Sequence, residues 1–333
     1  MALLGLPDEI LAVFRAFRTC EFATLAKDGT PIAWPTLPFF DADQGQFVVT
    51  TSIALAQKAL NIRRDGRVSL LFSEPRASGL ANPAAVLVQG DAVAPDEVVT
   101  TIKGYEEGLA MVFQRQPASA LYSSNPLMRA MSDWYYMRLI MTVTPRRIFW
   151  WPGGDFSHAP LRIDLAPAAG APPARRSASA APAAASADDW PVLLRQLARF
   201  PSAVISGRDA QGYPFSARCR PTPDAASHTL RVMLPPEAPI EPGPAGLLCH
   251  SHDDLLWKQE SFGLRGALQR ADDGWRLEPL AIIPGISPDV LSLGRFFIDS
   301  RRKAKAYLAK RNLPRPTIPW DDIIAVKKQA LSQ

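Results

Sequence analysis

The chain has 333 residues, of which 47% are hydrophobic and 21% charged, and 37 Lys and Arg against 32 Asp and Glu give a formal net charge of +5. This balance is typical of a globular protein long enough for two domains with separate cores. Six of the basic residues lie in 301–311, so much of the net charge is concentrated there; this run is typical of a solvated helix face, and we expect no nucleic-acid or membrane partner. We predict a cytoplasmic protein, because the three cysteines are scattered, the N-terminus has no signal-peptide pattern, and no apolar run approaches about 18 residues.

The first 164 residues are dominated by short apolar segments separated by turn signals. A helix is predicted over 7–18, where apolar residues recur on one face, and further helices over 95–115 and near 126–133. The segments EFATLA, PIAWPTLPFF, QFVVTT, RVSLLF, AAVLVQGDAV and MRLIMTVTPRRIFWW read as strands. Asp-Gly and Gln-Gly turns between them indicate an antiparallel barrel or sandwich.

A composition change marks the boundary of this unit. Residues 165–188 are almost entirely Ala, Pro, Ser and Gly, which cannot bury enough apolar surface to order themselves, so we predict a linker there. The predicted domains are a first barrel over 1–164, a second barrel over 189–287 and a helical extension over 288–333. The fold class is mainly β (α+β), with two tandem split β-barrels and peripheral helices.

The second half repeats the order of the first. A helix at 189–199 is followed by SAVISGRDAQGYPFSA, which aligns with FATLAKDGTPIAW so that Gly212-Tyr213-Pro214 falls on Gly29-Thr30-Pro31. TLRVM then matches QFVV, PAGLLCH matches GRVSLLF, and Gly266 falls on Gly90. We interpret the chain as a tandem repeat of one β-rich unit.

The two copies differ at one place. The first has TTSIALAQKALNIRRDG between its third and fourth strands, whereas the second has PPEAPIEPGP, whose five prolines forbid a helix. Thr50, Thr51 and Ser52 precede a helix over 53–63, and a helix N-terminus with hydroxyl donors favours an anion. Lys58 can reach a phosphate there. The alternative is that Ser52 only caps the helix and Lys58 is a surface lysine.

Residues 10–152 resemble the pyridoxamine 5′-phosphate oxidase-like FMN-binding split-barrel family. The resemblance rests on ATLAKDGTPIAWPTLPFF, FVVTTSIALAQKALNIRRDGRVSLLF, SGLANPAAVLVQGDAV and VTPRRIFWWPGGD, in this order and spacing. It implies a flavin phosphate held by the strand-end hydroxyls and Lys58, with Gln57 where the oxidases have an arginine. The implied cofactor-binding residues are Trp34, Pro35, Thr36, Thr50, Thr51, Ser52, Gln57, Lys58, Ser78 and Gln89.

The resemblance also limits the reaction. The oxidases begin the strand beside the flavin ring with an arginine, where this chain has Trp34, and their C-terminal substrate-binding residues are not found here. Pyridoxamine phosphate oxidation is therefore not expected. For Gln89 the alternative is a polar residue at the barrel rim.

Split barrels of this family generally bind the cofactor between two barrels. The second copy lacks the phosphate helix, so we expect it to close over the first as an intrachain partner, which gives one site per chain and leaves a further homodimer open. His250 and His252 could ligate zinc with Cys249 or Asp253, but no second pair supports a metal site, and we assign none. His250 could also face the cofactor or ligate haem; the alternative is a histidine at the end of a surface strand.

The sequence therefore predicts an FMN-dependent oxidoreductase acting on an unknown small molecule. A reductase that uses the deazaflavin F420 is the first alternative, and a non-catalytic flavin- or haem-binding carrier, sensor or stress protein is the second. No Ser-His-Asp or paired-carboxylate pattern stands out in the sequence, so no catalytic residue is assigned.

Overall fold

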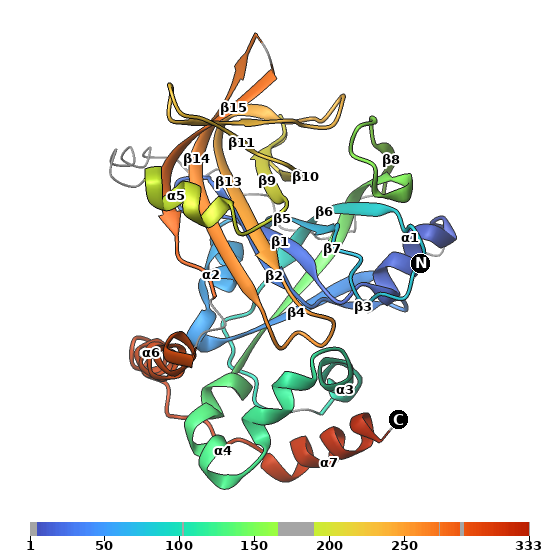
Figure 1. Cartoon of the computed structure of the whole chain (residues 1–333). Coiled ribbons are helices and arrows are strands. Elements are labelled where there is room, and N and C mark those ends of the chain that lie inside the picture. Colours follow the sequence, from blue (N-terminus) through green and yellow to red (C-terminus); the bar gives the residue numbers. More distant parts are fainter. Residues whose placement is uncertain (1–4, 102, 166–189, 273, 287–289, 333) are drawn as a thin grey trace.

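Two antiparallel sheets form the body of the protein (Figure 1). The computed structural model describes residues 5–101, 103–165, 190–272, 274–286 and 290–332. The first sheet contains β1 (Cys20–Leu25), β2 (Pro31–Thr36), β3 (Phe39–Asp41), β4 (Gln46–Ser52), β5 (Arg67–Phe72), β6 (Ala85–Val93), β7 (Arg138–Trp151) and β8 (Leu161–Asp164). The second contains β9 (Ala203–Arg208), β10 (Pro214–Cys219), β11 (Thr222–Asp224), β12 (Thr229–Val232), β13 (Glu241–Ser251), β14 (Glu260–Ala271) and β15 (Gly274–Ile283).

The two sheets have the same topology. The strand order is β2-β1-β5-β6-β7-β4-β3 in the first and β10-β9-β13-β14-β15-β12-β11 in the second, and β8 pairs with β7 alone. Even the irregularities match, because the register shifts between Gln89 and Gly90 in β6 and between Arg265 and Gly266 in β14. This identity of order confirms the predicted fold class and the tandem arrangement.

The matching hairpin turns explain why the two halves of the sequence align at Gly29 and Gly212. Gly29 and Gly212 have φ values of +80° and +83°, a conformation that favours glycine. Each glycine N–H closes its turn on a backbone carbonyl, that of Ala26 or of Asp209, and the next strand begins with a proline two residues later. The same residue types therefore set the same register in both halves.

Helices lie around the sheets and at one end of the molecule. They are α1 (Asp8–Ala16), η1 (Ile53–Leu55), α2 (Gln57–Arg64), α3 (Glu106–Arg115), η2 (Pro117–Ser123), α4 (Pro126–Ser132), η3 (Asp133–Tyr136), η4 (Pro152–Gly154), α5 (Trp190–Leu197), α6 (Val290–Ala309) and α7 (Trp320–Leu331). The prediction of one helix over 95–115 was wrong for its first half. Val99 instead exchanges backbone hydrogen bonds with Arg138 at the start of β7, which holds this part of the chain extended.

Two hydrophobic clusters hold the molecule together. One fills the first barrel and includes Phe14, Phe47 and Phe72. The other joins the interior of the second barrel to the outer face of β5, β6 and β7, where Leu71, Leu87, Phe149 and Trp151 are buried. The barrels are therefore packed face to face through apolar side chains, as an intrachain pair.

The C-terminal segment returns to the first barrel. Tyr307 and Leu308 of α6 and Ile323 of α7 join the first cluster, α6 contacts η1, and α7 packs on α3. Figure 1 shows these helices at the end of the molecule opposite β11 and β15. The predicted linker 165–188 lies outside the described residues apart from Leu165, so the domain limits stay a prediction. No helix in the described part of the chain is long and apolar enough to span a membrane.

Candidate functional site

The predicted anion site begins where β4 ends, and local structure already uses two of its three hydroxyls. The Ser52 hydroxyl accepts the Ala54 N–H at 3.1 Å and donates to the Trp134 carbonyl at 2.6 Å. The Thr51 hydroxyl donates to the Leu55 carbonyl at 3.2 Å. Ser52 therefore caps η1, as the alternative interpretation expected, and the hydroxyls of Thr51 and Ser52 already have partners within the chain.

Thr50 has a different partner. It lies on the opposite face of β4 from the core residues Phe47 and Val49, and its hydroxyl accepts a 2.6 Å hydrogen bond from the Arg138 guanidinium. Arg138 begins β7 and is paired with Ser52 across the ladder. The sequence did not single out this arginine, because 86 residues separate it from Ser52; its place at the start of a strand was the only signal.

Lys58 and Arg138 are the two positively charged residues of this site. The Lys58 ammonium lies 5.3 Å from the centroid of the Trp34 ring, so the predicted phosphate-binding lysine and the predicted ring-lining residue do meet. Burial and then the neighbouring Arg138 charge lower the pKa of Lys58 to about 8. Because the Arg138 charge disfavours the protonated form of Lys58, an anion bound beside both side chains would be stabilised by them. We call Thr50, Lys58 and Arg138 the basic corner.

A large cavity adjoins the basic corner. Its volume is about 780 Å³, within the usual range for small-molecule sites of roughly 300–1,000 Å³. One wall is the outer face of β4 and β7, and the other is α3 with the extended segment before it. Thr50 and Arg138 belong to both the corner and the cavity. The cavity is also lined by Leu37, Phe39, Asp43, Val48, Tyr105, Glu107, Gly108, Met111 and Ile140.

The remaining residues predicted near the flavin ring have local roles. Trp34 and Pro35 also line a cavity of about 40 Å³ between β2 and β13, too small for a ring system. The Thr36 hydroxyl donates to the Trp34 carbonyl at 3.1 Å. Gln57 bonds to Asn61 one turn along α2, and the Ser78 hydroxyl accepts the Leu80 N–H within its own loop.

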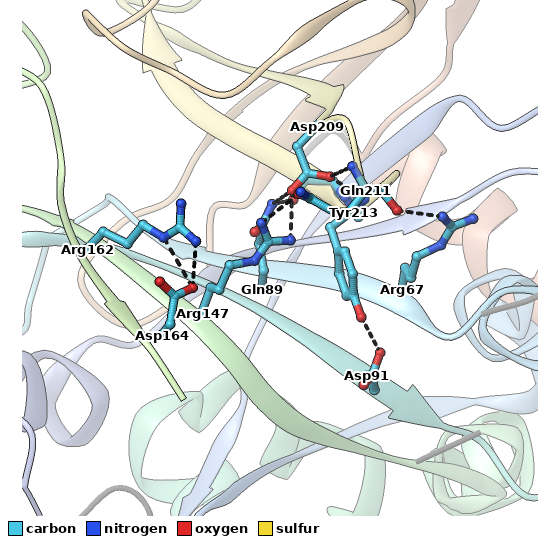
Figure 2. A network of polar contacts seen from close by, with 10 residues as sticks. Arg67, Gln89, Asp91, Arg147, Arg162, Asp164, Asp209, Gln211 and Tyr213 are labelled. Carbon is cyan, nitrogen blue, oxygen red and sulfur yellow. Dashed lines mark hydrogen bonds and ion pairs between the residues drawn. The ribbon is translucent and has the colours of Figure 1, made fainter. Parts of the chain in front are cut away.

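Gln89 lies between the two barrels. Its side-chain N–H₂ donates to an Asp209 carboxylate oxygen at 3.1 Å and to the Pro214 carbonyl at 3.0 Å, and Arg147 pairs with the same Asp209 oxygen at 2.9 Å. Figure 2 shows this convergence, with Tyr213 reaching from the second barrel to Asp91 in the first. Gln89 is completely buried and lines neither the 780 Å³ cavity nor the β2–β13 cavity. The rim position expected as its alternative is therefore wrong.

His250 is also buried between the barrels rather than exposed at a strand end. Its Nε2 lies 2.7 Å from a Glu21 carboxylate oxygen, and Arg218 and Ser73 contact the same carboxylate. The Glu21 carboxylate therefore occupies the Nε2 atom of His250, which would have to be freed before it could ligate haem. Among the residues that the structure describes, no group of three or more His, Cys, Asp or Glu side chains is placed to hold a metal ion.

The C-terminal extension buttresses the predicted anion segment. The Tyr307 hydroxyl donates to Asp96 at 3.1 Å, and Arg63 of α2 and Arg311 pair with the same carboxylate at 2.6 and 3.0 Å. The helix α6 thereby holds α2 and η1 in place from outside. Sequence reasoning did not foresee this contact, because the extension has no counterpart in the first half.

Comparison with known proteins gives one family and several solved structures. Residues 6–150 match the family model described as pyridoxamine 5′-phosphate oxidase. No curated protein sequence matches the chain.

Three solved structures illustrate the structural similarity. A conserved hypothetical protein from Mycobacterium tuberculosis is 24% identical, with 46% of this chain and 89% of that one covered and a TM-score of 0.33. The haem storage protein HutZ from Vibrio cholerae is 15% identical, with 42% and 90% covered and a TM-score of 0.30. ChuZ from Campylobacter jejuni is 9% identical, with 47% and 58% covered and a TM-score of 0.33.

Proposed function

Because residues 6–150 match the pyridoxamine 5′-phosphate oxidase family model, we propose that the chain is a split-barrel protein of this kind that binds FMN and acts as an oxidoreductase on a small molecule. The observation that carries the proposal is the basic corner at the edge of the 780 Å³ cavity. A phosphate monoester fits it because the Arg138 guanidinium contacts the Thr50 hydroxyl and the Arg138 charge acts on the neighbouring Lys58.

The residues that would hold the phosphate differ from those expected. In this proposal Thr50, Lys58 and Arg138 contact the phosphate. The hydroxyls of Thr51 and Ser52 have other partners, so these two residues only hold η1 in its conformation. Trp34 stays beside Lys58 and bounds the site on the β2 side. Bound FMN would supply the redox chemistry, while the chain orients it and excludes water.

The second barrel takes the place of a second subunit in this proposal. Its strand β13 packs against β2, the strand that carries Trp34, and so fixes one side of the site. The second barrel has no helix between β12 and β13 to hold a phosphate of its own. One FMN per chain is the expected stoichiometry.

Titration of the full-length chain with FMN tests the proposal. Loss of a charge-assisted contact costs about 1.5–3 kcal/mol, so Lys58→Met is expected to raise the FMN Kd about 10-fold to 100-fold. Lys305→Met, at an exposed position of α6, is the matched control and is expected to leave the Kd unchanged. Equal FMN affinity in wild type and Lys58→Met would show that the basic corner does not bind the phosphate of FMN.

The visible spectrum of the purified protein separates the alternatives. Flavin absorption maxima with one FMN per chain support the proposal. A Soret band without flavin maxima would identify haem as the cofactor. Tight binding of F420 with no binding of FMN would identify the deazaflavin as the cofactor.

A further inference from the structure

The 780 Å³ cavity has walls suited to an apolar organic molecule. Leu37, Phe39, Val48 and Ile140 line its sheet side, and Met111 lines it from α3. Apolar walls of this kind supply most of the binding free energy of a small ligand, while a few polar groups at defined places select among ligands. The charge pattern of the cavity therefore decides which class of molecule it takes.

That charge pattern is polarised. Arg138 is the single basic residue among the described residues that line the cavity, and it lies at the basic corner. Four acidic residues line the cavity from the β3–β4 hairpin and the first turn of α3, and all but the partly buried Asp41 are exposed: Asp41, Asp43, Glu106 and Glu107. Two of them already accept backbone hydrogen bonds, Asp41 from Gln44 and Glu106 from Gly104.

Asp43 and Glu107 remain available to a ligand. Asp43 comes from the β3–β4 turn and Glu107 from the first turn of α3, so they approach the opening from opposite walls. Neither forms an ion pair with any residue in the described part of the chain. The exposed ring of Tyr105 lines the same side, and an aromatic face beside carboxylates is a favourable environment for an organic cation.

We propose that this cavity is the substrate site of the proposed flavoprotein and that its substrate is an organic cation with an apolar body and no phosphate. The assignment rests on the proposed function, because the phosphate of FMN would neutralise the basic corner and leave the acidic side as the dominant charge. The cationic group lies between Asp43 and Glu107, and the apolar body extends along β4 and β7 toward the basic corner.

Three probes of one shape test the charge preference: phenethylamine, 2-phenylethanol and 3-phenylpropionate. Calorimetric titration of the FMN-loaded full-length chain is expected to rank the cation first, the alcohol second and the anion last. Exposed ion pairs are weak, so removing both carboxylates with Asp43→Asn and Glu107→Gln is expected to weaken phenethylamine about twofold to thirtyfold and to leave 2-phenylethanol unchanged. Asp254→Asn, an exposed acid outside the cavity, is the charge control.

A steric variant tests the location. A Cβ at Gly108 in α3 meets nothing within 4 Å, so Gly108→Phe places a ring in the cavity without a backbone clash, and a helix tolerates either Phe or Ala better than Gly. Gly108→Phe is expected to abolish phenethylamine binding, whereas Gly108→Ala is expected to retain it.

The outcomes separate this inference from the proposed function. Equal affinity for the three probes, or unchanged binding to Gly108→Phe, in a protein that binds FMN overturns the cation site and leaves the flavoprotein standing. Failure to bind FMN overturns the flavoprotein and the substrate role with it. In that case cation binding that depends on Asp43 and Glu107 would still establish the cavity as a cation-binding site.

Discussion

Glu21 in β1 and His250 in β13 come from different barrels, and their carboxylate and imidazole atoms lie 2.7 Å apart with both side chains buried. Arg218 of β10 pairs with the same carboxylate at 2.7 Å and also bonds to the Ser73 hydroxyl at 3.0 Å. Because an unpaired buried charge is costly, this cluster favours the one arrangement of the two barrels in which all its members meet.

Glu21→Gln is expected to destabilise the protein by about 1–3 kcal/mol, because it leaves the partly buried Arg218 guanidinium without its counter-charge. Urea unfolding of the full-length chain, followed by tryptophan fluorescence, measures the effect. The same change at the exposed Glu97 is the control and is expected to alter stability by less than about 0.5 kcal/mol. A stability equal to wild type in Glu21→Gln would show that the cluster does not hold the barrels.

The pH dependence of stability should report the same carboxylate. Burial by itself would raise the pKa of Glu21, but Arg218, His250 and Ser73 outweigh burial and lower it below 4.5. Its stabilising contribution is therefore fully present above the unfolded pKa and is lost as pH falls through the folded pKa. Below pH 4.5, wild type should lose more stability than Glu21→Gln; parallel curves for the two proteins would contradict this assignment.

Anion binding at the basic corner should weaken in mild alkali. With the pKa of Lys58 lowered to about 8, mainly by burial, the free protein loses this positive charge as pH rises through 8. A phosphate monoester becomes a dianion above about pH 6, so its affinity should be highest between about pH 6 and 8. FMN titrations at pH 7 and pH 9.5 measure the change, and Lys58→Met should show a much smaller pH effect. An affinity that rises with pH would exclude Lys58 as a phosphate ligand.

Gly246 in β13 sits where the second barrel approaches the backbone of β2. A Cβ at this position would lie 2.2 Å from the Pro31 carbonyl oxygen, so Gly246→Ala must push the strands apart and is expected to cost about 1–3 kcal/mol. Gly294→Ala in α6 adds the same methyl where nothing lies within 4 Å and should stabilise by up to about 1 kcal/mol. Thermal unfolding of both variants provides the comparison, and a neutral Gly246→Ala would mean that the barrels do not pack this closely.

Removal of the second barrel should change the association state of the first. A chain ending at residue 164 would expose Leu71, Leu87, Phe149 and Trp151, which the second barrel now covers, and would lose α6 and α7. We expect dimers or larger species in light-scattering chromatography, and recovery of a one-to-one complex when 190–333 is co-expressed. A stable monomer of the first half that binds FMN as tightly as the full chain would refute the internal-partner proposal.

The strand segments and the hairpin turns were predictable from the sequence because each depends on short-range patterns, and the repeat was predictable because both halves carry the same series of patterns. Gly29 and Gly212 occupy equivalent turns as the alignment predicted. The first half of the predicted 95–115 helix was wrong because Val99 finds a partner in Arg138, nearly forty residues away, and such a contact overrides local helix signals.

The candidate site divides in the same way. The hydroxyl run and Lys58 could be predicted from the sequence, because a strand end followed by a helix is a local pattern. Three features could not be predicted from the sequence: the contact of Arg138 with Thr50, the burial of Gln89 between the barrels, and the packing of α6 against η1. Those relationships join residues far apart in the chain, and only the folding of the barrel, the docking of its copy and the packing of the extension bring them together. The sequence alone thus determined the repeated unit and the family that its first copy resembles, whereas the tertiary structure decided which charges share a site.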